Sequence, residues 1–401
     1  MTAPLAGVRV IEAATWLAAP AAAALLADLG ADVIKIEPPG GDPWRHFDTS
    51  SMGFEEPSAI QYGFELDNRG KRSIAVDLRQ SGAPELVRRL CEEADVFVTN
   101  LMQRERWGID ERTLRAVNPA LIYTAVSGYG ERGPAADREG FDYAAFWASS
   151  GIMGLSGEPS SPPPFCRTGQ GDHATALNLL SAILVALRLR DQSGEGQTVE
   201  VNLMQTGLWT IGADAAVAAV SGEQPRRYDR SRPWNPIRNS YQTRDGRWLL
   251  LGMTQADRFW PRFVAMIGAP SWALDPRFAT LEGRKRHAAE LRARIEELIA
   301  SADLAEWGRR LDEAELVWAP VATLPEALAD PQVEANGVLE EIEHPQAGAY
   351  RTLAAPFRVS GAETAARGPA PAPGEHTSEV LAELGLDDDE IASLAASGVF
   401  G

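Results

Sequence analysis

Short hydrophobic, β-branched runs alternate with longer amphipathic stretches through the first third of the chain. The first unit predicts a strand over 8–12, a helix over 20–31 and a strand over 32–37, with Pro20 in the first helical turn and Gly30 near its end. The same alternation then predicts strands and helices in turn over 72–78, 84–94, 95–100, 110–118 and 121–130. Strands that alternate with helices indicate a parallel sheet covered on both faces. Ligands of such sheets bind beyond the carboxyl ends of the strands, here at loops 99–102 and 127–133.

The second half of the chain begins with a run that is apolar almost all round, residues 176–190, which predicts a buried helix of about four turns. An Arg-, Pro- and Trp-rich stretch over 226–236 has the composition of a linker. The later pattern predicts strands over 194–203, 247–254 and 355–361, a helix over 287–302, and a final helix pair after a Pro/Ala-rich stretch at 366–373. A chain of 401 residues is expected to form about two domains.

Composition narrows the possible partners and the compartment. The formal net charge of −18 argues against a nucleic-acid partner, because phosphate backbones require a dense basic face. Cys91 and Cys166 form neither a disulfide framework nor a C-x-x-C metal motif, and the chain shows no metal-ligand spacing. The Ala-rich stretch 13–26 is too short to span a bilayer and lacks a basic region before it. We therefore expect a cytoplasmic protein without a membrane, nucleic-acid or metal partner.

The segment "RTGQGDHATA", residues 167–176, contains the main candidate for chemistry, Asp172. Asp172 has three interpretations. It fits an N-cap whose carboxylate accepts N–H bonds from Ala174 or Thr175, a role compatible with catalysis because the helix dipole would keep it ionised. It also fits a nucleophile. The third interpretation is a dinucleotide turn, G-x-G-x-x-A, but that turn requires a hydrophobic strand before it, and "SSPPPFCRT" precedes it here.

Other candidates have simpler explanations. His173 is most simply a first-turn helix residue, and the remaining histidines are scattered without ligand spacing. "KRS" at 71–73 is most simply a solvated entrance to a strand. No G-x-S-x-G element supports a serine hydrolase.

Taken in order, the motifs of the chain resemble the class III CoA-transferases, the family of formyl-CoA transferase and L-carnitine CoA-transferase. The resemblance extends over nearly the whole chain. It is carried by "PLAGVRVIE", "LGADVIKIEPPGGD", "GKRSIAVDL", "ADVFVTN", "NPALIYTAVSGYG", "GQGDHATALNLLSAILVAL", "GEGQTVEVNLM" and "GEHTSEVLAELGL".

The resemblance implies an α/β fold. A large domain with a Rossmann-like parallel sheet would begin with 1–225, a smaller inserted α/β domain would cover 226–330, and residues 331–401 would return to the large domain. It also implies a homodimer of interlocked rings. The substrates would be an acyl-CoA and a carboxylic acid, with coenzyme A entering as a thioester substrate and no cofactor tightly bound.

In this family the aspartate of the G-D pair is the nucleophile, a position that Asp172 occupies. Backbone N–H groups of Gly169 and Gly171 are candidate oxyanion donors. A basic residue found after "KIE" in some relatives is Pro38 here, and the glycine-rich lid of formyl-CoA transferases has no counterpart. The positions that match the family's CoA-binding stretches are Leu17, Ala18, Val76, Asp77, Leu78, Arg79, Asn100, Leu101, Met102, Arg106, Glu139, Gly140, Phe141 and Asp142.

Two alternatives remain open. The same fold is found in α-methylacyl-CoA racemases, which pair the aspartate with a histidine in a G-H-D element. Here the element is "GFD", and Phe141 cannot accept a proton. The second alternative is a non-catalytic CoA-binding protein, against which the retained Asp172 argues.

Overall fold

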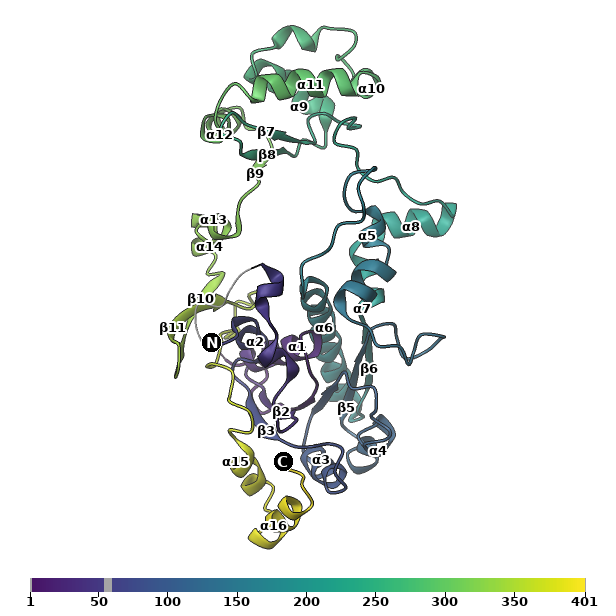
Figure 1. The fold of residues 1–401 in the computed structure, drawn as a ribbon, viewed down its shortest axis with the longest axis vertical. Coiled ribbons are helices and arrows are strands. Elements are labelled where there is room, and N and C mark those ends of the chain that lie inside the picture. Colours follow the sequence, from purple (N-terminus) through teal and green to yellow (C-terminus); the bar gives the residue numbers. More distant parts are fainter. Residues whose placement is uncertain (1, 54–59, 401) are drawn as a thin grey trace. The chain divides into compact units, whose positions relative to one another are not determined.

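The computed structural model describes residues 2–53 and 60–400. Its central element is a six-stranded sheet in the order β3-β2-β1-β4-β5-β6, in which every neighbouring pair is parallel (Figure 1). This order is that of the doubly wound Rossmann sheet. The predicted parallel α/β architecture is therefore confirmed. The strands are β1 Arg9–Ala13, β2 Asp32–Glu37, β3 Arg72–Ala75, β4 Val96–Thr99, β5 Ile122–Ser127 and β6 Thr198–Asn202.

Helices cover both faces of the sheet. Successive residues of a strand point to opposite faces, so each strand contributes side chains to both helix layers. In β1, Val10 packs in the cluster with α1 (Ala18–Asp28) and α6 (Gln170–Ser193). The next residue, Ile11, packs in a separate cluster with α3 (Ala83–Glu92), α4 (Glu111–Val117) and α15 (Thr377–Glu383). The remaining helices of this part of the chain are α2 Tyr62–Asn68, α5 Ile152–Leu155, α7 Leu203–Thr210, α8 Gly212–Ser221 and α16 Asp388–Ala396.

The long helix α6 is not buried all round, contrary to the sequence-based prediction. Its inner face, with Leu179 and Ile183, is buried against the sheet layer. Its outer face leaves Leu184 and Val185 37% and 60% exposed, and Trp209 of the following helix α7 is 80% exposed. By length and hydropathy α6 alone meets the requirements of a membrane span among the described residues, although its inner face is packed within the domain. The apolar composition of α6 therefore reflects two faces, only one of which the chain itself covers.

The chain divides into two compact units, residues 1–154, 165–223 and 334–401 in the first and 155–164 and 224–333 in the second. The second unit contains an antiparallel sheet in the order β7-β8-β9 and a core of its own around Trp260 and Phe263. The predicted division did not separate residues 155–164 from the first domain. The elements of the second unit are β7 Ser240–Gln242, β8 Trp248–Leu251, β9 Trp318–Pro320, α9 Ala256–Met266, α10 Leu281–Arg286, α11 Ala288–Ile299, α12 Leu304–Glu313 and α13 Leu324–Leu328.

Two further sequence predictions are wrong. The predicted strand at 355–361 is irregular, and the strands of this region are instead the hairpin β10 (Leu339–His344) and β11 (Gly348–Leu353), which follows α14 (Pro331–Ala335). Pro356 explains the irregular segment, because proline has no N–H for a ladder. The predicted linker 226–236 is structured at its end, where the buried Asn235 side chain donates to the Met253 carbonyl oxygen.

Lys71 belongs to a buried ion cluster and not to a solvated strand entrance. Its Nζ lies 2.6 Å from Glu12 Oε2, and Lys35 Nζ lies 2.7 Å from Glu12 Oε1 and 2.9 Å from Asp42 Oδ2. All four side chains are fully buried. Lys71 Nζ also donates to the Pro20 and Asp67 carbonyl oxygens and to Asn68. Two cations and two carboxylates compensate one another, which is the condition for keeping charge in a protein interior.

Replacing Glu12 with Gln should lower the free energy of unfolding by about 3–5 kcal/mol, because Lys71 would lose its carboxylate partner inside the protein. The loss should shrink as the pH rises, since burial already lowers the pKa of Lys71 to about 8 and its proton can leave. Urea unfolding measures the change. Glu85→Gln, which removes an exposed helical ion pair with Arg88, is the control and should cost less than about 1 kcal/mol. Equal losses in the two variants would contradict a structural role for the cluster.

Candidate active site

A cavity of about 470 Å³ opens beyond the carboxyl ends of β1, β4 and β5. The loops that follow these strands line it, as the sequence predicted for 99–102 and 127–133, together with the start of α6. From these segments the cavity receives five acidic side chains, several aromatic rings and two arginines. Its lining includes Thr15, Trp16, Leu17, Ala18, Trp44, Phe47, Asn100, Leu101, Met102, Arg104, Ser127, Gly128, Glu131, Arg138, Glu139, Gly140, Phe141, Asp142, Tyr143, Thr168 and Asp172.

Asp172 lies in the first turn of α6, but it is not the N-cap. The N-cap is Gly169, whose φ of +81° lies in the left-handed region that glycine adopts without strain. The helix begins at Gln170, so Asp172 is its third residue and its side chain is directed into the cavity lining. The N-cap interpretation of Asp172 is therefore wrong.

Burial raises the pKa of Asp172 to about 7, and the nearby carboxylates Asp142 and Asp67 add to the shift while His173 opposes it. The expectation that the helix dipole keeps Asp172 ionised is not met, because desolvation and like charge exceed it. Half of the Asp172 carboxyl groups would be protonated near neutral pH. A carboxylate with so perturbed a pKa in a cavity has the properties of a catalytic group.

Asp142 is a second buried carboxyl group of the site. Burial raises its pKa to about 6, and the backbone N–H groups of Gly171 and Gly169 act in the opposite direction. A Cβ atom at residue 171 would lie only 2.2 Å from Asp142 Oδ1. Gly171 therefore leaves the space in which the Asp142 carboxyl group lies against the start of α6. In this arrangement the amides of Gly169 and Gly171 act on Asp142, and their role as oxyanion donors remains a prediction.

A hydrogen-bonded chain supports the other side of α6. His173 Nε2 lies 2.9 Å from Asp67 Oδ1. The indole N–H of Trp44 donates a hydrogen bond to Asp67 Oδ2 at 3.1 Å. Burial would lower the pKa of His173, but the bond to Asp67 outweighs it and the pKa is raised. His173 is thus more than a first-turn helix residue, since it ties α6 to α2 through a buried carboxylate.

The loop between β1 and α1 is fixed by side chains from other loops. Asn100 accepts from the Thr15 N–H at 3.1 Å and donates to the Thr15 carbonyl oxygen at 2.6 Å. The Trp16 N–H donates to Asp42, and Trp16 has a φ of +66°, which is rare for a residue with a side chain. These contacts hold the Trp16 ring at the cavity in spite of the strained backbone.

Aromatic side chains form one wall of the cavity. The Trp16 ring meets Phe141 edge to face at 5.7 Å and Phe47 at 6.1 Å, and Phe141 stacks on Tyr143 at 6.2 Å. Such a wall is apolar, and burial is the main cause of the raised pKa of the Asp172 carboxyl group.

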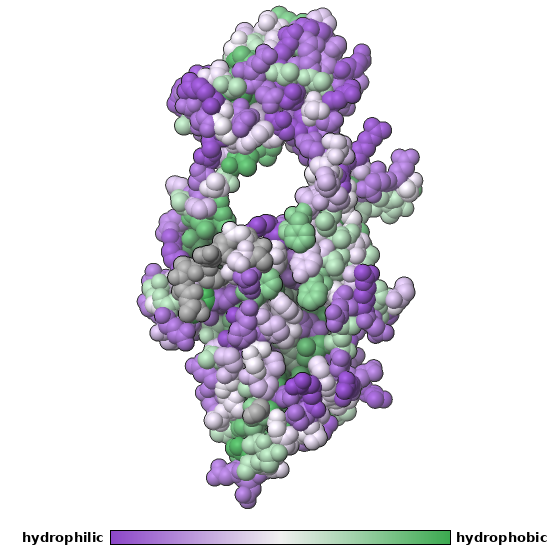
Figure 2. All heavy atoms as spheres, in the orientation of Figure 1, coloured by the Kyte–Doolittle hydropathy of each residue, from purple (hydrophilic) through white to green (hydrophobic). Residues whose placement is uncertain are grey.

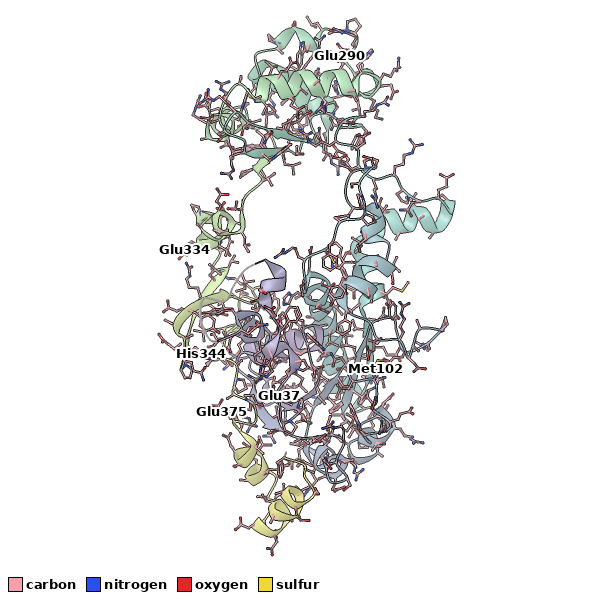
Figure 3. The ribbon with its side chains drawn as sticks, in the orientation of Figure 1. Glu37, Met102, Glu290, Glu334, His344 and Glu375 are labelled. Atoms are coloured by element: carbon pink, nitrogen blue, oxygen red, sulfur yellow. The ribbon has the colours of Figure 1, made fainter. Side chains whose placement is uncertain are left out.

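The structure brings together most of the residues predicted from the sequence. Met102, labelled in Figure 3, is 48% exposed. The predicted residues that line the cavity are Leu17, Ala18, Asn100, Leu101, Met102, Glu139, Gly140, Phe141, Asp142 and Asp172. The predicted residues that do not line it are Val76, Asp77, Leu78, Arg79, Arg106, Gly169 and Gly171. Arg79 is paired with Asp77 at 2.7 Å, and Arg106 contacts Gln103.

Several lining residues were not predicted. Arg104 is paired with Glu131, and the Arg138 guanidinium lies 5.2 Å from the centre of the Tyr129 ring. Trp16 and Arg104 come three and five residues after the ends of β1 and β4, so their place in the loops after strand ends was a signal in the sequence. Trp44 and Phe47 follow no strand end directly, and only the tertiary structure places them. Among residues 2–53 and 60–400, no group of His, Cys, Asp and Glu side chains has the arrangement of a metal site.

Both the sequence and the fold are similar to those of known proteins. The sequence profile described as CoA-transferase family III matches residues 5–377. The chain is 32% identical to an (R)-2-hydroxy-4-methylpentanoate CoA-transferase of Clostridioides difficile, over 98% of this chain and 99% of the relative. It is 36% identical to a succinate–glutarate CoA-transferase of Agrobacterium fabrum, over 95% and 96% of the two chains. A crystal structure of a CAIB/BAIF family protein from Brucella suis superposes with a TM-score of 0.84 at 32% identity, covering 96% of this chain and all of that one.

Replacing Asp172 with Asn should stabilise the protein at neutral and alkaline pH. In the folded protein the carboxyl group has a pKa of about 7, above the unfolded value near ~4, so its contribution to stability is lost as the pH rises between the two values. The Asn variant has no such loss. The melting temperature of the variant should therefore exceed that of the wild type by a margin that grows from about pH 4 to pH 8.

The matched control for this measurement is Asp110→Asn at the N-cap of α4. The bond from Thr113 outweighs burial and lowers the pKa of Asp110, so the wild-type carboxylate contributes stability above its unfolded pKa. Asp110→Asn should therefore lower the melting temperature at neutral pH, whereas Asp172→Asn should raise it. If the difference in melting temperature between Asp172→Asn and the wild type does not change with pH, the pKa of Asp172 is not raised.

Proposed function

The chain belongs to CoA-transferase family III and is a CoA-transferase, and we propose that it transfers coenzyme A from an acyl-CoA to a carboxylic acid through a thioester on Asp172. The observation that carries the proposal is the Asp172 carboxyl group, which lies in a 470 Å³ cavity with its pKa raised to about 7. Desolvation makes a carboxylate a better nucleophile, because attack then does not require it to shed strongly bound water.

The proposed reaction begins when an oxygen of ionised Asp172 attacks the carbonyl carbon of the acyl-CoA. The C–S bond breaks, CoA thiolate leaves and a mixed anhydride forms. The thiolate then attacks the aspartyl carbonyl carbon of the anhydride, which releases the donor acid as a carboxylate and leaves an aspartyl-CoA thioester. The acceptor carboxylate repeats the two steps in reverse order and leaves as its own CoA thioester.

The surroundings of Asp172 suit these intermediates. Anhydrides hydrolyse readily, and the wall of Trp16, Phe47 and Phe141 limits the access of water to the carboxyl group. The CoA part is proposed to run along the predicted residues that line the cavity and outward past Val76 to Arg79. Arg138 supplies positive charge within the lining for its phosphates, and Arg104 would do so by exchanging its pairing with Glu131.

A racemase is disfavoured by the residue that would be its second base. Phe141 stacks on Tyr143 and meets Trp16 edge to face, so it contributes to the aromatic wall and offers no group that accepts a proton. Asp142, which follows it, is buried against Gly171 and takes no part in the wall.

We also propose that the protein is a homodimer of interlocked chains. The outer faces of α6, α7 and α8 leave apolar side chains exposed, including Val185, Trp209 and Val220 at 60%, 80% and 92%. Several apolar side chains with this degree of exposure are typical of a face that another subunit covers.

Asp172→Asn should lower the rate of CoA transfer at least about a thousandfold, because the neutral amide cannot form the anhydride. Wild-type protein incubated with an acyl-CoA should carry a covalent CoA adduct on the peptide that contains Asp172, and hydroxylamine should convert that residue to a hydroxamate. Mass spectrometry detects both products.

Asp110→Asn, which retains an N-cap at a site away from the cavity, should keep the activity and the adduct. An active Asp172→Asn variant, or turnover by wild-type protein that never becomes labelled, would rule out the covalent mechanism.

Light scattering should report a dimer even at low protein concentration. If the chains are interlocked, two preparations with different tags should not exchange subunits unless they are unfolded and refolded together. A monomer would refute the dimer, and rapid exchange of tags would refute the interlocked arrangement.

A further inference from the structure

The second unit contains a cavity of about 420 Å³ that is lined by cationic side chains and an indole ring. Arg232 and Trp234 come from the segment before β7, and Lys285, Arg286 and His287 come from the junction of α10 and α11. The volume is within the range of about 300–1,000 Å³ that ligand sites occupy. The site is formed by the second unit alone and is not the cavity that contains Asp172.

Few carboxylates balance these cations. Glu290 on the first turn of α11 (Figure 3) is the acidic residue of the lining, but Arg277 and Arg294 contact its Oε1 at 2.6 and 2.7 Å. Lys285 and Arg286 reach Glu282 only at 3.9 and 3.8 Å. Among the described residues Arg232 has no carboxylate at ion-pair distance, and Lys285, Arg286 and His287 have only long ion pairs of 3.7–3.9 Å, in a chain of net charge −18.

The backbone at the start of α11 also carries partial positive charge. His287 is the N-cap of the twelve-residue helix α11 and provides no side-chain cap, and Ala288 and Ala289 of the first turn line the cavity. The positive end of the α11 dipole favours an anion, as the cationic side chains do, while the C-terminal end of α10 lies one residue away at His287. Side chains and backbone thus point to the same charge of ligand.

The indole ring adds a flat apolar surface to the site. Trp234 is 40% exposed, and the guanidinium of Arg238 lies 5.4 Å from the centre of its ring. On the face in view the surface of this unit is mainly hydrophilic (Figure 2). Aromatic rings in such a position stack against bases, while arginine and lysine bind phosphates.

We propose that this cavity, named here the Trp234 site, binds a small anion that carries two or more phosphate groups. Arg232, Lys285, Arg286 and the start of α11 would bind the phosphates. Trp234 would stack on a base where the ligand is a nucleotide. An inorganic polyphosphate shares the phosphate chemistry but has no group for the indole.

Isothermal titration calorimetry of the full chain at low ionic strength, with pyrophosphate and with ADP, tests the proposal. The double variant Lys285→Gln/Arg286→Gln should bind pyrophosphate at least about tenfold more weakly than the wild type, because two charge-assisted contacts are removed. The matched control is Arg258→Gln on α9, an exposed arginine outside the cavity, which should keep the wild-type affinity. Both variants should retain CoA transfer and the melting temperature of the wild type.

Trp234→Ala distinguishes the two sources of phosphate. A loss of affinity for ADP with unchanged affinity for pyrophosphate identifies a nucleotide site, and unchanged affinity for both identifies a site for the phosphates alone. Three results would overturn the proposal. The first is that the wild type does not bind pyrophosphate. The second is that the double variant binds it as tightly as the wild type. The third is that Arg258→Gln loses as much affinity as the double variant, which would show that binding depends only on the total charge of the protein.

Discussion

Charge compensation in the interior beneath the first loop determines the geometry of the active site. Lys35 connects Glu12 to Asp42 and donates to the Ala14 carbonyl oxygen, while Lys71 connects Glu12 to the Pro20 carbonyl oxygen at the start of α1. Asp42 in turn accepts the Trp16 N–H. The strained backbone at Trp16 therefore depends on ions that water does not reach. Such interactions have a fixed geometry, because any displaced charge would be left uncompensated in a low-dielectric interior.

The same unit treats its carboxyl groups in two opposite ways. Glu37 is buried, but Arg45, Lys35 and Ser73 outweigh desolvation and lower its pKa to about 2. Asp142 and Asp172 lack such cations, and burial raises their pKa values to about 6 and about 7. Paired carboxylates serve the structure, and the carboxyl groups left without a cation face the cavity or its floor. The difference between the two groups makes Asp142 and Asp172 candidates for chemistry in a chain with 56 acidic residues.

The sequence predicted the elements of the parallel sheet and the residue at the centre of the site, because strand and helix periodicity are local properties. It did not predict the register of α6, since the left-handed Gly169 moves the start of the helix ahead of Asp172. Lys71 looked solvated because lysines are rarely buried, and two of its partner groups, the Glu12 carboxylate and the Pro20 carbonyl oxygen, come from distant segments. The apolar run of α6 correctly predicted a helix but wrongly predicted that the helix is buried on all sides. Composition alone does not tell which faces of an apolar helix the same chain covers. Trp44 and Phe47 were missed because only the tertiary fold brings them to the cavity.

The contact between Asp142 and Gly171 has a consequence for the evolution of this chain. A methyl group at residue 171 would meet Asp142 Oδ1 at 2.2 Å and Phe146 Cγ at 2.3 Å, so neither neighbour tolerates it. A lineage that enlarges residue 171 must first have replaced both residue 142 and residue 146 with smaller side chains. In the reverse order the Asp142 and Phe146 side chains would have to move. The three positions are therefore expected to vary together and in one direction, so that the acidic pair of the cavity is lost through position 142 before the glycine can change.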